Sequence, residues 1–119
     1  MGVSREYRSF VNDELGRVIP GLRDRAMFGG VGIYAGDVFF ALIDEDTLYF
    51  KVDDTNRDDY VAAGSGPFRP YGPDGEVMQY YEVPADVLED AGALRTWAEK
   101  AIAVARAKRR PPRKGRKKS

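Results

Sequence analysis

Few residues of this chain are of the types that carry out common enzyme chemistry. The sequence has no Cys and no His, which excludes disulfides, Cys/His zinc sites, thiol nucleophiles and catalytic triads built on His. Carboxylates and phenols remain, and Glu82 directly follows Tyr80 and Tyr81. Alternation along a strand puts Tyr80 and Glu82 on one face and Tyr81 on the other, so the three cannot converge as general acid and base. The sequence therefore predicts a protein that is not an enzyme and has no catalytic residues.

Two further patterns could hold a phosphate or a metal ion. Residues 29–32 read Gly-Gly-Val-Gly, but a P-loop needs a following Lys-Ser/Thr and a helix N-terminus, and here a strand pattern follows. Acidic groups at residues 44–46, 53–54 and 58–59 could bind Mg²⁺ or Ca²⁺, yet they lack the spacing of a calcium loop and stand where turns and helix caps favour carboxylates. We expect neither a metal nor a cofactor.

The strongest charge signal is a basic segment at the C-terminal end. Residues 106–119 contain nine basic residues and no acidic ones: Arg106, Lys108, Arg109, Arg110, Arg113, Lys114, Arg116, Lys117 and Lys118. Lys and Arg without interleaved aromatic residues contact nucleic-acid phosphates without reading bases. Alternatively, the segment is solvated or neutralises its own body, because residues 1–105 carry ten basic against nineteen acidic residues. Both interpretations remain open at this point.

Length and composition predict one domain followed by a disordered tail. The chain has 119 residues, 43% of them hydrophobic and 32% charged, which suits a single water-soluble domain. A block of like charges with Pro and Gly does not fold by itself, so we expect a folded domain at residues 1–105 and a disordered basic tail at 106–119. No stretch has the length or apolar character of a membrane span or signal peptide. The sequence predicts a cytoplasmic protein without a membrane partner.

Hydrophobic periodicity predicts the elements of an α+β fold. Apolar spacings of three and four predict a helix over about residues 4–19 and another from about residue 90 into the basic tail. Residues 25–50 predict three strands joined by two tight hairpins, and Gly72-Pro73-Asp74-Gly75 predicts the turn of a further hairpin after a short helix. The predicted order is α-β3-α-β2-α. It indicates two layers, an antiparallel five-stranded sheet with helices on one face.

Aromatic residues are frequent in the predicted strands and could serve binding. A base-stacking sheet is disfavoured because the acidic body repels phosphates. An aromatic sheet face that no helix covers is better suited to bury against another protein. We therefore expect a dimer or partner face that includes Tyr49, Lys51 and Tyr81, with a homodimer as one outcome.

Several strings of the sequence carry a family resemblance. They are MFGGVGIY from Met27, FFALI from Phe39, LYFKVDDTNR from Leu48, AAG from Ala62, PF at Pro67, MQYYEVP from Met78, LED from Leu88 and Trp97-Ala98. Over about residues 20–105 the chain resembles the N-terminal domain of the TfoX/Sxy competence-regulator family. The resemblance implies an α-β3-α-β2-α fold similar to that of secretion chaperones, in which dimers are common, and no catalytic residues.

The resemblance also implies a function. Full-length members add a helical C-terminal domain and act as coactivators of natural-transformation genes with the cyclic-AMP receptor protein, whereas this chain continues into the basic tail. We expect a regulatory, protein-interaction module in transcriptional regulation, with a transcription factor as a possible partner. The alternative is a small nucleic-acid-associated protein that binds phosphates non-specifically through its tail.

Overall fold

The computed structural model describes residues 2–27, 29–69 and 79–109, and these form an α+β fold of two layers. Within them the chain runs through α1 (Arg5–Val18), β1 (Leu22–Met27), β2 (Gly30–Ala35), β3 (Val38–Asp44), β4 (Thr47–Lys51), α2 (Arg57–Ala62), β5 (Tyr80–Glu82), α3 (Ala85–Leu88) and α4 (Ala91–Arg109). The five strands form one sheet in the order β1-β2-β3-β4-β5, and every neighbouring pair is antiparallel.

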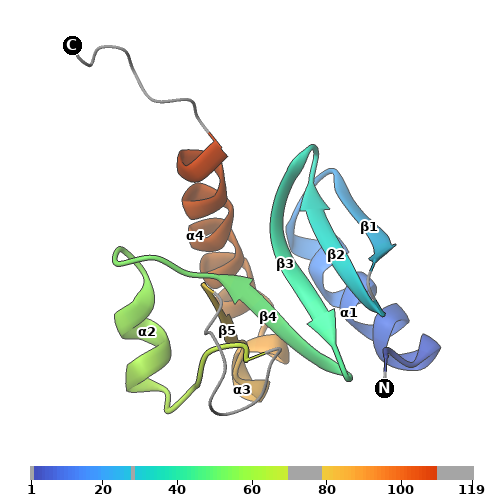
Figure 1. The fold of residues 1–119 in the computed structure, drawn as a ribbon, viewed down its shortest axis with the longest axis horizontal. Coiled ribbons are helices and arrows are strands. Elements are labelled where there is room, and N and C mark those ends of the chain that lie inside the picture. The colour runs from blue at the N-terminus through green and yellow to red at the C-terminus, as the bar shows by residue number, and fades with distance from the viewer. Residues whose placement is uncertain (1, 28, 70–78, 110–119) are drawn as a thin grey trace.

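The terminal helices cover one face of the sheet. Figure 1 shows α1 and α4 together behind the strands, with α1 behind β1 and β2. Buried side chains from both helices and from β2, β3 and β4 form a single hydrophobic core between the layers. The predicted fold class, an antiparallel five-stranded sheet with helices on one face, is confirmed. No helix in the described part of the chain is long and apolar enough to cross a membrane.

The strand order differs in detail from the prediction. Four strands precede α2, where the sequence predicted three, because residues 22–35 form the hairpin of β1 and β2. Gly29 provides the turn with a φ of 81°, a left-handed conformation that glycine adopts without steric cost. Among the described residues one strand, β5, follows α2. The predicted turn at Gly72-Pro73-Asp74-Gly75 lies outside the described residues.

Helix α1 forms as its sequence pattern predicts. Ser4 is its N-cap, and the Ser4 side chain accepts a hydrogen bond from the Tyr7 backbone N–H at 3.1 Å. Val11, Leu15 and Val18 lie on the buried stripe. This stripe docks α1 on the sheet beside α4, so hydrophobic burial and capping together determine where the helix begins and packs.

Helix α4 begins at a capped end and continues into the basic segment, as the sequence predicts. Asp90 Oδ1 accepts hydrogen bonds from the backbone N–H groups of Gly92 and Ala93, at 3.0 and 3.1 Å. The helix then runs to Arg109. Residues 106–109, the first four residues of the predicted tail, are therefore helical. The remaining predicted tail, residues 110–119, lies outside the described residues.

A bulge in β3 increases the number of large side chains that face the helices. Ile33 pairs with Ala41 and the next residue of β2, Tyr34, pairs with Phe39, so Phe40 is the extra residue. Phe40 and Ala41 are both fully buried, and the Phe40 ring lies 5.7 Å from that of Phe50. The bulge turns two successive residues toward the core, which regular alternation does not allow.

Candidate functional site

The sheet face opposite the helices is the candidate site, and we call it the open face. No described helix packs on it, and strand register assigns its side chains. Its apolar and aromatic members are Met27, Tyr34, Phe39, Leu42, Tyr49, Phe68 and Tyr80. Apart from Tyr80 they are half-buried, because they pack against one another across the strands.

One row of rings crosses the open face from β2 to β5. The Tyr34 ring stacks on Phe39 with centroids 5.2 Å apart, and Phe39 lies 5.9 Å from Tyr80. Tyr80 is only 5% exposed, and burial, with a smaller contribution from Tyr34, raises its pKa to about 12. The Lys51 ammonium ends the row 4.8 Å from the Tyr80 ring centroid, a cation–π arrangement. Burial, followed by repulsion from Lys108, lowers the pKa of Lys51.

A second pair of rings lies beside this row. The Tyr49 and Phe68 rings are 4.7 Å apart, and Tyr49 stands opposite Glu82 in the β4–β5 ladder. Burial, followed by the negative charge of Glu82, raises the pKa of Tyr49. Tyr49 therefore stays a neutral phenol at physiological pH, and the pair offers an apolar surface with a hydroxyl at its margin.

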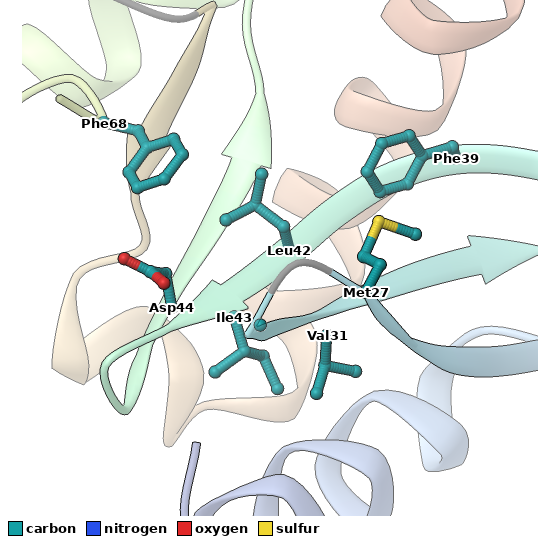
Figure 2. Close-up of a pocket in the computed structure, with 8 residues that line it drawn as sticks. Met27, Val31, Phe39, Leu42, Ile43, Asp44 and Phe68 are labelled. Atoms are coloured by element: carbon teal, nitrogen blue, oxygen red, sulfur yellow. The ribbon is translucent and has the colours of Figure 1, made fainter. Parts of the chain in front are cut away.

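An apolar pocket opens between these rings and β1, with a volume of about 140 Å³. Its lining residues are Met27, Gly30, Val31, Phe39, Leu42, Ile43, Asp44 and Phe68. Figure 2 shows the side chains of Met27, Phe39 and Leu42 on the open face, while Val31 and Ile43 point toward α1. A cavity of roughly this size holds a benzene-sized group, so the pocket suits one apolar side chain of a partner.

Neighbouring groups approach two glycines of β2 closely. A Cβ at Gly32 would lie 2.6 Å from Met27 Cε and 3.1 Å from a ring carbon of Phe39, so both side chains lie over the bare glycine. At Gly30 a Cβ would lie 2.6 Å from the carbonyl oxygen of Ile43.

The residues predicted for a partner face are divided between the two faces of the sheet. Tyr49 and Lys51 lie on the open face, opposite Glu82 and Tyr80. Tyr81 stands opposite Phe50 and packs against the core instead. Its inclusion with Tyr49 and Lys51 was wrong, because successive residues of a strand point to opposite faces.

Sequence reasoning did not select Met27, Leu42 and Phe68 for this face. The bulge at Phe40 shifts the alternation of β3, so the sequence alone does not show that Leu42 lies on the open face. Met27 and Phe68 come from β1 and from the segment beside β5, and no periodic pattern identifies them. The Gly32 position was the one available signal, since a glycine inside a strand marks a close approach by another group.

Part of the predicted nucleic-acid segment is described. Arg106 and Lys108 are exposed on the last turns of α4, and Arg109 ends the helix. The other six predicted contacts, Arg110, Arg113, Lys114, Arg116, Lys117 and Lys118, lie outside the described residues. In the part of the chain that the structure describes, no three Asp or Glu side chains gather as metal ligands would.

Comparison with models of known protein families identifies a similar domain. The sequence model of the TfoX N-terminal domain matches residues 13–105, a range that extends from α1 to α4 and includes the whole open face. A search of curated proteins finds no significant match.

Proposed function

The chain belongs to the TfoX N-terminal domain family, and from this premise we propose that it is a non-enzymatic regulatory module that works by binding other proteins. The proposal places it in the cytoplasm and in transcriptional regulation, with a transcription factor as the partner class that the competence-regulator family favours. It assigns no catalytic residue, metal or cofactor to the chain.

The observation that carries the proposal is the open face. Two groups of rings and a pocket of about 140 Å³ lie on a sheet surface that no described helix covers. Protein interfaces are enriched in aromatic residues, and their binding energy concentrates where an anchor side chain fills a pocket. A second copy of the chain is the first partner we propose for this face, which makes the protein a homodimer.

The test combines light scattering with one substitution on each side of the sheet. We expect the full chain to have a dimer mass at tens of micromolar concentration. Tyr49→Glu places a charge in the aromatic interface and should give the monomer mass with an unchanged circular dichroism spectrum. Thr96→Glu, at an exposed position of α4, is the matched control and should stay dimeric. A monomer mass for the native chain would remove the homodimer from the proposal.

The regulatory part has its own test. The full chain and Tyr49→Glu are used side by side to capture proteins from the native cytosol. The proposal expects a transcription factor that the native chain enriches and that Tyr49→Glu loses. Equal capture by both proteins would show that the open face does not bind the factor.

Binding of nucleic acid through the basic segment is the second candidate function. It is favoured by the end of α4, where exposed Arg106 and Lys108 begin a run of nine basic residues. Affinity should fall steeply with salt and should not depend on sequence. Deletion of residues 110–119 retains α4 and should abolish binding to duplex DNA in fluorescence anisotropy. DNA binding that survives this deletion would place the contact on the folded domain instead.

A further inference from the structure

We propose that the outer edge of β1 binds an extended acidic segment of a partner protein, which joins the sheet as an additional strand beside β1. The proposal rests on the proposed role as a protein-interaction module and adds a second surface to it, with a partner of defined chemistry. Backbone hydrogen bonds would supply affinity, and two arginines would select the charge.

The two edges of the sheet differ in what covers them. At the β5 edge, the Phe68 backbone N–H donates to the Tyr80 carbonyl at 2.7 Å, and the Glu82 N–H donates to the Gly66 carbonyl at 3.0 Å. Pro67 also forms a β-bridge with Tyr81. At the other edge, β1 has β2 on one side and no described strand on the other. Figure 1 shows β1 at the margin of the sheet.

The backbone of β1 has free hydrogen-bonding groups along this edge. The Gly36 N–H donates to the Gly21 carbonyl at 2.9 Å, and residues of an antiparallel pair alternate between those that bond each other and those that point away. Gly21 therefore bonds to the β2 side, and by the register with β2 so do Arg23 and Arg25. The N–H and C=O groups of the residues between them, Leu22, Asp24 and Ala26, point outward. An unpaired edge of this kind is a template for strand addition.

Arg23 and Arg25 give the edge its charge. They lie opposite Tyr34 and Gly32, so both side chains are on the open face, and both are exposed. Neither has an ion-pair partner among the described residues. Four other cations of the domain do have one: Arg8 with Asp24, Arg17 with Glu14, Arg57 with Asp54, and Lys100 with Asp59. Two unpaired guanidinium groups two residues apart are therefore available for carboxylates of an added strand.

A second copy of β1 is a poor occupant of the same edge. Two copies of β1 would pair as antiparallel strands related by a two-fold axis. Facing residues of such a pair have their side chains on the same face, so one β1 residue must face its own copy at the axis. An axis nearer either end of β1 pairs at most three of its six residues with those of the copy. An axis at Asp24 sets Arg23 against Arg25 and Asp24 against itself, and axes at Arg23 or Arg25 set each arginine against its own copy. Like charges that face each other across strands are destabilising.

The geometry also specifies the sequence pattern of the partner. Carboxylates that meet Arg23 and Arg25 must be two residues apart in the added strand, because alternate residues share a face. The residue between them faces the other side of the sheet. There a groove of about 350 Å³ lies between α1 and β1, and it is lined by Asn12, Gly16, Ile19, Pro20, Gly21, Leu22, Arg23 and Asp24. We expect an acidic-x-acidic segment with an apolar residue at the centre.

The experiment uses the full chain and a fluorescein-labelled octapeptide that alternates glutamate and valine. Anisotropy should report binding that weakens with salt and weakens about tenfold in Arg23→Glu/Arg25→Glu, where two favourable pairs become repulsive. Ala26→Pro removes one outward N–H from an edge position that tolerates proline, and it should also weaken binding severalfold. Arg95→Glu/Arg106→Glu changes the net charge equally at exposed positions of α4 and should bind as the native chain does.

Two further measurements separate strand addition from adventitious charge attraction. A peptide that alternates lysine and valine should bind Arg23→Glu/Arg25→Glu more tightly than the native chain. On binding of the acidic peptide, hydrogen exchange should slow at the outward amides of Leu22, Asp24 and Ala26. Unchanged exchange there, equal affinity of both double variants, or no binding of the acidic peptide would overturn the proposal. None of these outcomes depends on whether the Tyr49→Glu variant is a monomer or a dimer in light scattering. Failure of the proposal for the β1 edge is therefore distinguishable from failure of the proposal for the open face.

Discussion

Replacing Tyr60 by Phe should stabilise the domain, although Tyr60 is among its most deeply buried residues. Tyr60 lies in α2, is 1% exposed, and packs edge-on against the Trp97 ring at 4.7 Å and beside Tyr81 at 5.7 Å. Its hydroxyl oxygen is buried and has no hydrogen-bond partner among the described residues. The ring contacts stabilise the fold, whereas the hydroxyl loses its water on folding and gains nothing in return.

The expected change in stability depends on the cost of the buried hydroxyl and on the ring contacts that the substitution keeps. A buried hydroxyl without a hydrogen bond costs about 1–3 kcal/mol in protein mutational data. Tyr60→Phe keeps the ring and its contacts with Trp97 and Tyr81, and it leaves a gap of one oxygen atom whose lost dispersion contacts offset part of the gain. We expect the free energy of unfolding to rise by about 1 kcal/mol.

Urea unfolding at pH 7, followed by circular dichroism, measures this change. Tyr34→Phe on the open face is the matched control, because its ring is half-buried and its hydroxyl is not taken from water to the same extent, so its effect should stay within about 0.5 kcal/mol. A loss of 1 kcal/mol or more in Tyr60→Phe would refute the reasoning. It would mean that the Tyr60 hydroxyl has a hydrogen-bond partner inside the core.

The pH dependence gives a second measure of the same group. Burial, followed by the charge of Asp59, raises the pKa of Tyr60 well above its ordinary value. A group whose pKa is raised by folding contributes stability that is present below its unfolded pKa, about 10 for tyrosine, and is lost as the pH rises further. The native chain should thus lose up to about 1.4 kcal/mol per pH unit above pH 10 from this group. Tyr60→Phe should lose stability less steeply, with Tyr80, whose pKa is about 12, still contributing.

Two smaller predictions concern the hairpin of β1 and β2 and its contact with α1. Gly30→Ala should lower the free energy of unfolding by about 1–3 kcal/mol, because its Cβ would lie 2.6 Å from the backbone oxygen of Ile43. Gly16→Ala has nothing within 4 Å of its Cβ and should instead raise the free energy of unfolding by up to about 1 kcal/mol. Equal effects of the two substitutions in urea titrations would contradict the prediction. Asp24→Asn should cost about 1 kcal/mol at pH 7, because the hydrogen bond from Arg8 lowers the pKa of Asp24. The stability from this ion pair is present above the unfolded-state pKa of Asp24, about 4, and is lost as the pH falls through the folded-state pKa. The acid unfolding curves of the native chain and Asp24→Asn should therefore converge at low pH. Parallel curves would argue against the ion pair.

Local pattern was sufficient for α1, α2 and α4 and for most of the sheet. The stripe of α1 and the cap of α4 at Asp90 depend on neighbours within a few residues, and such signals are legible in the sequence. The sequence also grouped Tyr49 and Lys51 on one face, and the register of β4 places both on the open face. The hairpin of β1 and β2 was not predicted, because Arg23, Asp24 and Arg25 give β1 no apolar alternation of its own.

The candidate site depended on contacts that are distant in the sequence. The pocket combines Met27 of β1 with Phe39 of β3 and Phe68 beside β5, and only strand pairing brings these residues together. The face on which Tyr81 lies could be predicted relative to Tyr80, but which of the two faces the helices cover could not. That choice is made by where α1 and α4 dock.

By itself the sequence determined the fold class, the absence of Cys and His chemistry and the separation of an acidic body from a basic end, because composition and short-range periodicity encode these properties. It also indicated the family, through the resemblance of particular strings of residues. The tertiary structure alone decided that the aromatic rings meet on the face away from the helices and that β1 is the strand with a free edge. These are properties of pairing and packing between residues far apart in the chain, and the free energy that selects them is the burial of one common core.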